Sequence, residues 1–239
     1  SILNTLVSAF VVYYACRIAK QTPEQAWSCL QARGMYAGDD TLTAAPTTFG
    51  DFYTRAARGL GITMKLKYAD RTARDSVTFL ARVFGPDVWN GDPNSIQDPI
   101  RMLTKMVVCP KDTIDYRVKW HEKMAAYNLT DHGNPLVLAF MDTVSVLAKT
   151  DPDSVLAKFD EVGDARRVSW WAQHPPENQW PCTHAEWMLI HIQSCFEPHA
   201  LEQLYKHLAD VMTWPEFCDF PPVPALNEHA RYGELDYLL

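Results

Sequence analysis

The segment from Met35 to Leu42 constrains the fold more than any other part of this sequence. Two short runs containing apolar residues flank Gly38, Asp39 and Asp40, which predicts a β-hairpin with two carboxylates at its tip. Gly38 permits a tight turn because it has no Cβ, and acids at a turn point away from the sheet. Such a pair suits hard divalent cations such as Mg²⁺. Gly-Asp-Asp also occurs in ordinary solvated turns, so the segments on either side have to decide between the two interpretations.

Helices are predicted around the hairpin. The first spans residues 2–20, and its uncharged part over residues 1–16 is predicted to be a buried core helix because it is too short to span a membrane. A second helix begins with Thr22 as N-cap and Pro23 at its first position, and Gln25 completes a capping box. It ends near Gly34.

A third helix opens at residues 48–51 and stops at Gly59 and Gly61, with Phe52, Ala56 and Leu60 on one face. Residues 62–67 and 77–84 are predicted to be strands. This order indicates an antiparallel sheet backed by helices, an α+β fold.

The sequence changes character after the breakers at residues 85–94, where we place a domain boundary near residue 90. The remainder is predicted to be mostly helical, with helices over residues 98–107, 112–127, 134–149, 152–162, 183–196 and 198–212. Prolines 215, 221, 222 and 224 favour an extended tail.

Composition sets two further constraints. The net charge of −7 has the wrong sign for a chain that contacts nucleic-acid phosphates, since such contacts are made by lysine and arginine. The six cysteines have no paired spacing, which fits reduced thiols in a cytosolic protein.

The order of the segments resembles the palm domain of viral RNA-dependent RNA polymerases of positive-strand RNA viruses. Residues 1–5, Ser-Ile-Leu-Asn-Thr, are similar to the end of that family's second motif, and residues 35–42 are similar to its third, the Gly-Asp-Asp hairpin. Residues 61–71 resemble the fourth motif and residues 79–82 the fifth. The residues of the first segment and of the later helical region resemble those of nodavirus-like enzymes.

The resemblance implies a partial palm over residues 1–90, followed by a thumb and an extended tail over residues 91–239. Fingers and the first palm aspartate motif would lie upstream, so the chain is expected to be a C-terminal fragment that is inactive alone. RNA template and product, nucleoside triphosphates and the missing N-terminal part of the same polymerase are the implied partners. The implied location is the host cytoplasm, at membrane-associated replication sites reached through other parts of the polymerase.

The implied activity is RNA-templated nucleotidyl transfer with Mg²⁺ or Mn²⁺. Asp39 is then a direct ligand of both ions, together with an upstream aspartate, and Asp40 has a supporting role. Asn4 corresponds to the residue that selects ribose through its 2′ hydroxyl, with Ser1 and Thr5 contacting template or supporting Asn4. The alternative for Asn4 is a helix cap.

The fourth motif departs from the picornavirus-like pattern, in which a lysine near the leaving pyrophosphate can act as general acid. Here Arg71 stands at that position, after a two-residue insertion. Arginine does not give up its proton near neutral pH. Either Lys65 or Lys67 is the acid, or Arg71 only stabilises charge; each lysine fits a solvated strand position equally well.

In the fifth motif, the resemblance implies primer or RNA contacts by Phe79, Leu80 and Arg82. Strand alternation would place Leu80 and Arg82 on one face, and the alternative is a core strand with one exposed arginine. For the whole chain, the competing interpretations are a non-catalytic helical scaffold with a chance Gly-Asp-Asp turn, and another palm nucleotidyltransferase such as a reverse transcriptase.

Overall fold

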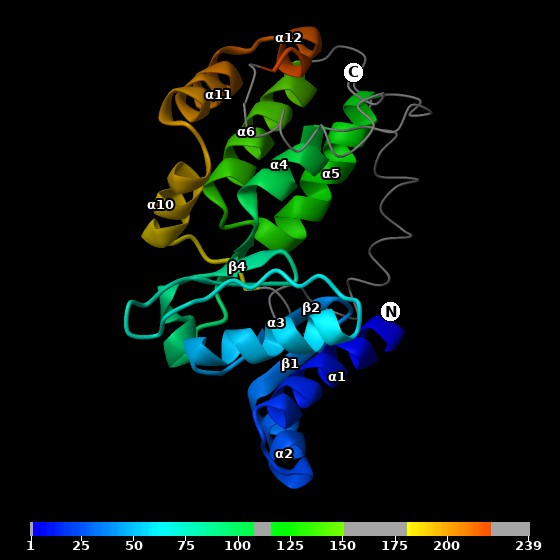
Figure 1. Cartoon of the computed structure of the whole chain (residues 1–239). Coiled ribbons are helices and arrows are strands. Elements are labelled where there is room, and N and C mark those ends of the chain that lie inside the picture. The colour runs from blue at the N-terminus through cyan, green and yellow to red at the C-terminus, as the bar shows by residue number, and fades with distance from the viewer. Residues whose placement is uncertain (1, 108–115, 151–180, 221–239) are drawn as a thin grey trace. The chain divides into compact units, whose positions relative to one another are not determined.

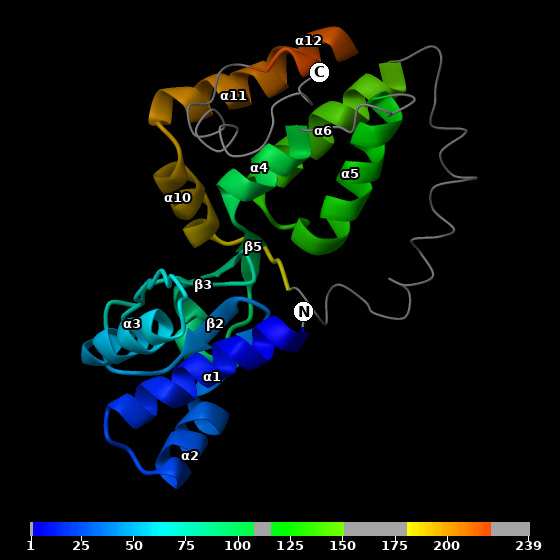
Figure 2. The same cartoon turned by 45° about the vertical axis from the view of Figure 1, so that its right-hand side comes forward.

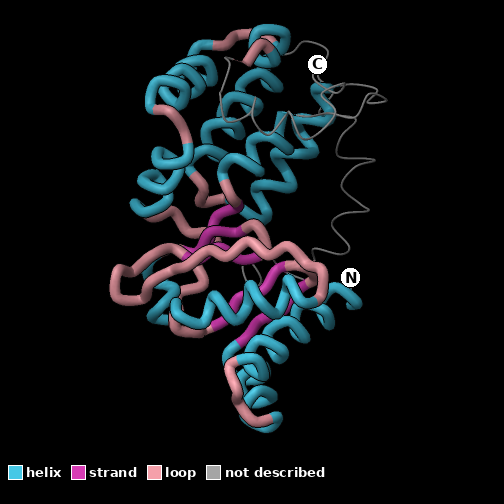
Figure 3. Tube along the Cα trace, viewed as in Figure 1, coloured by secondary structure: helices cyan, strands magenta, loops and turns pink. Residues whose placement is uncertain are grey.

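The computed structural model describes residues 2–107, 116–150 and 181–220, which form helices and two small antiparallel sheets (Figure 3). The predicted mixed α+β class is therefore confirmed. The chain divides into two compact units, residues 1–80 (unit 1) and residues 81–239 (unit 2).

Unit 1 contains three α-helices, α1 (Ile2–Ile18), α2 (Pro23–Arg33) and α3 (Gly50–Gly59), of which α1 packs against the other two (Figures 1 and 2). The predicted capping box at the start of α2 is confirmed. The Thr22 hydroxyl accepts from the Gln25 N–H (3.2 Å), and the Gln25 side chain accepts from the Thr22 N–H (2.9 Å). A short 3₁₀ turn (Thr47–Phe49) leads into α3.

The core of unit 1 is small and lies between α1 and α3. It consists of Val11, Val12, Ala15, Tyr53, Ala56 and Ala57. The prediction that residues 1–16 form a buried core helix is wrong for one face of α1, where Ile2, Leu3 and Leu6 are 83%, 68% and 62% exposed. On α3 the predicted face is confirmed at Ala56, which is buried, and at Phe52, which packs on this core, but Leu60 is exposed. No helix in the described ranges is long and apolar enough to span a membrane.

Two of the strand predictions need correction. Residues 62–67 belong to no strand, although their burial alternates as it would in a half-buried strand. Ile62, Met64 and Leu66 pack on the unit 1 core, so the segment is held by apolar contacts rather than by a sheet ladder. Residues 77–84 are two strands, β3 (Val77–Phe79) and β4 (Arg82–Phe84), separated by a turn. Leu80 and Ala81 in that turn both have positive φ (52° and 57°), as in the tightest hairpin connections.

In unit 2, β4 pairs antiparallel with β5 (Ser95–Gln97), and a 3₁₀ helix (Pro86–Asn90) lies between them in the chain. The α-helices among the described residues of unit 2 are α4 (Pro99–Val107), α5 (Tyr116–Asp131), α6 (Pro135–Thr150), α10 (Glu186–Cys195), α11 (Pro198–Asp210) and α12 (Trp214–Cys218). Five of the six helices predicted after residue 97 are thereby confirmed, and residues 152–162 lie outside the described residues. Strand β5 was not predicted.

The large core of unit 2 is built by these helices. α5 and α6 lie side by side, and α11 packs on α6 (Figures 1 and 2). Trp120 stacks on Phe140 with 5.8 Å between ring centroids and meets the edge of Phe217 at 4.8 Å. The prediction of an extended tail is wrong at Pro215, which sits in the first turn of α12, where a missing N–H costs nothing. The other tail prolines lie outside the described residues.

Candidate active site

The predicted hairpin is present in unit 1. Strands β1 (Gly34–Ala37) and β2 (Asp40–Thr43) pair antiparallel, with Ala37 opposite Asp40. The turn is therefore Gly38–Asp39, and Gly38 has a φ of 66°. A glycine with positive φ at the first turn position is typical of a type II′ hairpin.

The two acids are exposed at the tip of this hairpin. Asp39 is the second residue of the turn, and Asp40 is the first residue of β2. Within the described residues, no ion pair involves either carboxylate. Both are therefore accessible to a ligand from solvent.

The base of the hairpin is tied to α2. The Ala44 N–H donates to the Arg33 carbonyl (2.8 Å), and the Tyr36 hydroxyl donates to the Leu30 carbonyl (3.2 Å). Burial raises the pKa of Tyr36 to about 12, so the phenol stays protonated and remains a donor. These contacts fix the direction in which the hairpin leaves the helix.

The tip of the hairpin is tied to α1. The Gly38 N–H donates to the Thr5 hydroxyl oxygen (2.8 Å), and the Ser8 hydroxyl donates to the Gly38 carbonyl (2.9 Å). Thr5 was predicted as a nucleotide-binding residue, and the structure places it against the turn. Ser8 was not predicted, because a lone serine in an apolar helical run carries no local signal.

Asn4, also from the second motif, lies near the start of α1. Asn4 is exposed there, next in the chain to Thr5. Ser1 of the same motif lies outside the described residues. An exposed amide on the helix that holds the hairpin tip is accessible to a ligand.

The fourth motif has no regular secondary structure at Lys65 and Lys67, which are both exposed. Asp70 then closes a turn, because its carboxylate accepts from the N–H and the hydroxyl of Thr72 (2.7 Å each). These hydrogen bonds lower the pKa of Asp70. Arg71 is exposed in this turn. The side chains of Lys65, Lys67 and Arg71 are therefore all accessible to an anion.

The fifth motif is divided by the turn between β3 and β4, which overturns the predicted alternation along one strand. Leu80 is 53% exposed in that turn, whereas Phe79 is partly buried. Arg82 is only 6% exposed and is not the exposed strand residue of the alternative interpretation.

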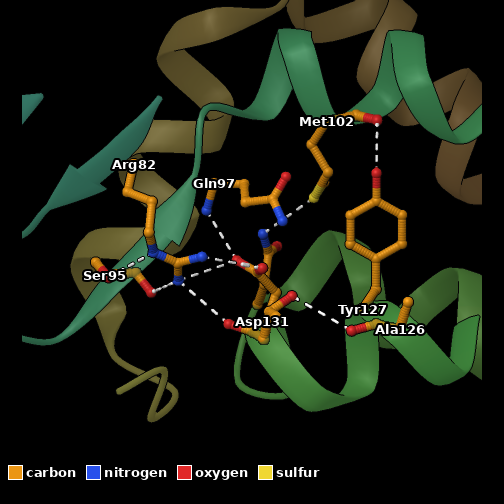
Figure 4. A network of polar contacts seen from close by, with 9 residues as sticks. Arg82, Ser95, Gln97, Met102, Ala126, Tyr127 and Asp131 are labelled. Carbon is orange, nitrogen blue, oxygen red and sulfur yellow. Dashed lines mark hydrogen bonds and ion pairs between the residues drawn. The ribbon is translucent and has the colours of Figure 1, made fainter. Parts of the chain in front are cut away.

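Arg82 is the centre of a buried polar network in unit 2 (Figure 4). Its guanidinium pairs with Asp131 (3.2 Å) and donates to the hydroxyl (2.9 Å) and the carbonyl (2.9 Å) of Ser95. Asp131, fully buried, also accepts from the Gln97 N–H (2.8 Å). Burial, together with the charge of Asp131, raises the pKa of Tyr127 to about 12. This network joins β4 and β5 to the end of α5, and sequence patterns gave no sign of Asp131.

The hairpin acids fit a divalent cation in ligand type, since carboxylate oxygens on a short turn are hard donors. In the part of the chain that the structure describes, no group of three or more His, Cys, Asp or Glu residues could hold a metal ion. Asp39 and Asp40 are the residues of this chain that would contribute ligands.

Comparison with known proteins agrees with the motifs. The chain is 29% identical to the RNA-directed RNA polymerase of Greasy grouper nervous necrosis virus over 86% of its length, and 30% identical to that of Atlantic halibut nervous necrosis virus over 74%. The polymerase of Striped jack nervous necrosis virus is 28% identical over 89%. This chain is similar to viral RNA-directed RNA polymerases. The resemblance inferred from the motifs, with its leaning towards nodaviruses, is confirmed.

The match covers only part of these relatives. The chain spans about a fifth of the length of the curated polymerases it matches, with coverage of 20%, 17% and 20%. No protein-family model and no solved structure matches the chain.

Proposed function

We propose that this chain is the C-terminal palm and thumb part of a viral RNA polymerase and carries carboxylates that bind the catalytic metal ions. The observation that carries the proposal is the exposed Asp39–Asp40 pair on a two-residue hairpin, in a chain whose relatives are RNA-directed RNA polymerases. In this proposal residues 1–90 are the partial palm and residues 91–239 the thumb and tail. The relatives do not favour the scaffold or the reverse transcriptase.

The proposed reaction is nucleotidyl transfer. The 3′ hydroxyl of the growing RNA attacks the α-phosphate of a nucleoside triphosphate, the new phosphodiester bond forms, and the bond to pyrophosphate breaks. The hydroxyl loses its proton and the pyrophosphate gains one. Bound Mg²⁺ or Mn²⁺ would neutralise charge on the attacking and leaving oxygens.

The residues of this chain contribute position and charge. Asp39 holds metal ions together with an aspartate from the rest of the polymerase, and Asp40 supports it. Asn4 can both donate to and accept from a ribose 2′ hydroxyl. Lys65 or Lys67 can protonate the leaving pyrophosphate, whereas Arg71 can only stabilise its charge, because an arginine keeps its proton.

For the fifth motif, the proposal is narrower than the sequence implied. Leu80 and Phe79 are the candidates for contact with the primer end, with Leu80 the more exposed. Arg82 supports the β4–β5 pair from within the unit 2 network, since its donors are engaged by Ser95 and Asp131. The location at membrane-associated sites of the host cytoplasm stays a prediction.

The test is nucleotide incorporation on a homopolymer template by the longer polymerase in which this chain would lie. Asp39→Ala is expected to abolish incorporation, because a methyl group cannot hold a cation, and Asp40→Asn is expected to reduce it less. Both variants should fold normally, since both positions are exposed. Near-normal incorporation by Asp39→Ala would refute the proposal.

A further inference from the structure

The backbone of Gly38 needs partners from outside its own hairpin. In a two-residue hairpin, the ladder pairs the residues on either side of the turn, here Ala37 and Asp40. The N–H and C=O of the first turn residue take no part in this ladder. Because Gly38 is partly buried, partners within the protein replace part of the contact of these groups with water. Two hydroxyls of α1 take both of them, Thr5 as acceptor and Ser8 as donor.

The two hydroxyls are arranged as a clamp. Thr5 and Ser8 are three residues apart on α1, a spacing that places side chains on the same helix face. The same face continues into Val12 and Ala15, which are buried in the unit 1 core. The helix is thus anchored by apolar packing along one part of this face and holds the turn with the other.

We infer that Thr5 and Ser8 are positioning residues that fix the Gly38–Asp39 turn on α1 and so set the position of the Asp39 carboxylate. The inference rests on the proposed function, because it takes Asp39 as the metal ligand. It also gives Thr5 a role other than the predicted contact with nucleotide or template. Asn4 is on the same helix as Thr5 and Ser8. These two hydrogen bonds therefore also fix the position of the ribose-selecting amide relative to the metal-binding turn.

Neutral hydroxyls suit this role. A charged group beside Gly38 would compete with the cation or with Asp39, whereas a hydroxyl satisfies the backbone without adding charge. The two hydrogen bonds restrain two adjacent peptide planes, those before and after the Gly38 Cα, so the pair limits rotation of the turn as well as its displacement. Small displacements of a catalytic group can cost a large part of the rate.

The experiment uses four variants of the full polymerase and two readouts that do not depend on activity. Thr5→Val removes the acceptor at constant shape, Ser8→Ala removes the donor, and Thr5→Ser keeps the hydroxyl. Thr54→Val is the matched control, because the Thr54 hydroxyl is partly buried in the same unit and donates only along its own helix, to the Gly50 carbonyl (3.0 Å). The readouts are hydrogen exchange of the peptide containing Gly38, and Mn²⁺ binding followed by electron paramagnetic resonance.

We expect Thr5→Val to accelerate exchange at the turn about tenfold and to weaken Mn²⁺ binding several-fold. Ser8→Ala should weaken Mn²⁺ binding to a smaller extent. Thr5→Ser should restore both readouts, and Thr54→Val should change neither.

Two outcomes would overturn the inference. Unchanged exchange in Thr5→Val and Ser8→Ala would show that the hydroxyls do not hold the turn. Faster exchange with unchanged Mn²⁺ binding would show that they hold it without positioning the ligand. Asp39→Asn, measured alongside, separates this inference from the proposed function. If Asp39→Asn leaves Mn²⁺ binding intact, the proposed function fails. If Asp39→Asn weakens Mn²⁺ binding but Thr5→Val and Ser8→Ala do not, only the inference about Thr5 and Ser8 is rejected.

Discussion

Asp39 and Asp40 in unit 1 and Asp131 in unit 2 are carboxylates at the ends of regular elements, but their surroundings are opposite. The first two are exposed at the hairpin tip. Asp131 is fully buried at the end of α5, where it pairs with Arg82 and accepts from the Gln97 N–H. The charge of Asp131 is thus neutralised by Arg82 within the fold, whereas the carboxylates of Asp39 and Asp40 remain available to a ligand.

The overall charge is divided in the same way. Residues 1–80 contain nine basic and six acidic residues, a net charge of +3, whereas residues 81–239 contain 13 basic and 23 acidic residues, a net charge of −10. The acidic balance of the chain, which seemed at odds with nucleic-acid binding, therefore comes from unit 2. Any phosphate contacts of this chain are expected in unit 1, which contains the candidate active site.

The two tight turns differ as well. Gly38 has positive φ where glycine adopts it without steric cost. Leu80 and Ala81 have positive φ although each has a Cβ, which costs about 1–2 kcal/mol per residue. One turn is relaxed and held by hydroxyls from α1, and the other is strained and must be held by the strands it connects.

The largest expected effect breaks the buried pair of unit 2. Asp131→Ala leaves Arg82 charged and buried without its carboxylate, which should reduce the free energy of unfolding by about 3–5 kcal/mol. The measurement is urea denaturation of the full polymerase, with fluorescence as the probe. Asp39→Ala is the matched control, since the same change at an exposed site should leave the midpoint almost unchanged. A similar midpoint shift in both variants would remove the contrast between the two acids.

Much of the fold could be predicted because its signals are local. The capping box at Thr22, the Gly-Asp-Asp turn and the periodicity of α4 and α6 each depend on residues within a few positions of one another. Residues 62–67 show where this fails. Their burial alternates as in a half-buried strand. Whether such a segment becomes a strand depends on a partner strand that sequence patterns do not locate.

The residues of the candidate site also differ in whether their signal is local. Asp39, Asp40 and Asn4 were found because the motif is contiguous. Ser8 and Asp131 were missed because their roles depend on contacts across 30 and 49 residues, with Gly38 and Arg82. The burial of Arg82 was also mispredicted, since the alternation was extended through a turn formed by two non-glycine residues.

Exchanging the residues of the two turns should give opposite results. Gly38→Ala adds a Cβ where φ is 66° and should destabilise unit 1 by about 1–2 kcal/mol, with reduced RNA synthesis because Asp39 is adjacent. Ala81→Gly relieves the strain at φ 57° and should stabilise the protein by about 1 kcal/mol or less. Thermal unfolding of both variants checks the pair, and destabilisation by Ala81→Gly would show that the turn is not strained.

A smaller effect is expected at the exposed amide of unit 1. Asn4→Ala should lower the preference for ribose over deoxyribose triphosphates several-fold, because one neutral hydrogen bond contributes about 0.5–1.5 kcal/mol. Single-nucleotide incorporation with matched ribo and deoxyribo substrates measures the ratio. An unchanged ratio would assign Asn4 to the helix start alone.

The smallest effect is a response to pH that only unit 2 can show through histidine, since all eight histidines of the chain follow residue 120. Burial lowers the pKa of His121 and of His191 below 6.5, although Asp98 partly opposes the shift at His191. The unfolded chain then binds more protons than the folded one, so the stabilisation is complete above pH 6.5 and is lost as the pH falls towards the folded-state pKa. Thermal unfolding between pH 7.5 and about 5 should show this loss, and His191→Gln should reduce its slope. If the slope stays the same in His191→Gln and in a His121→Gln variant, the loss arises from carboxylates, and the histidines do not distinguish the two units.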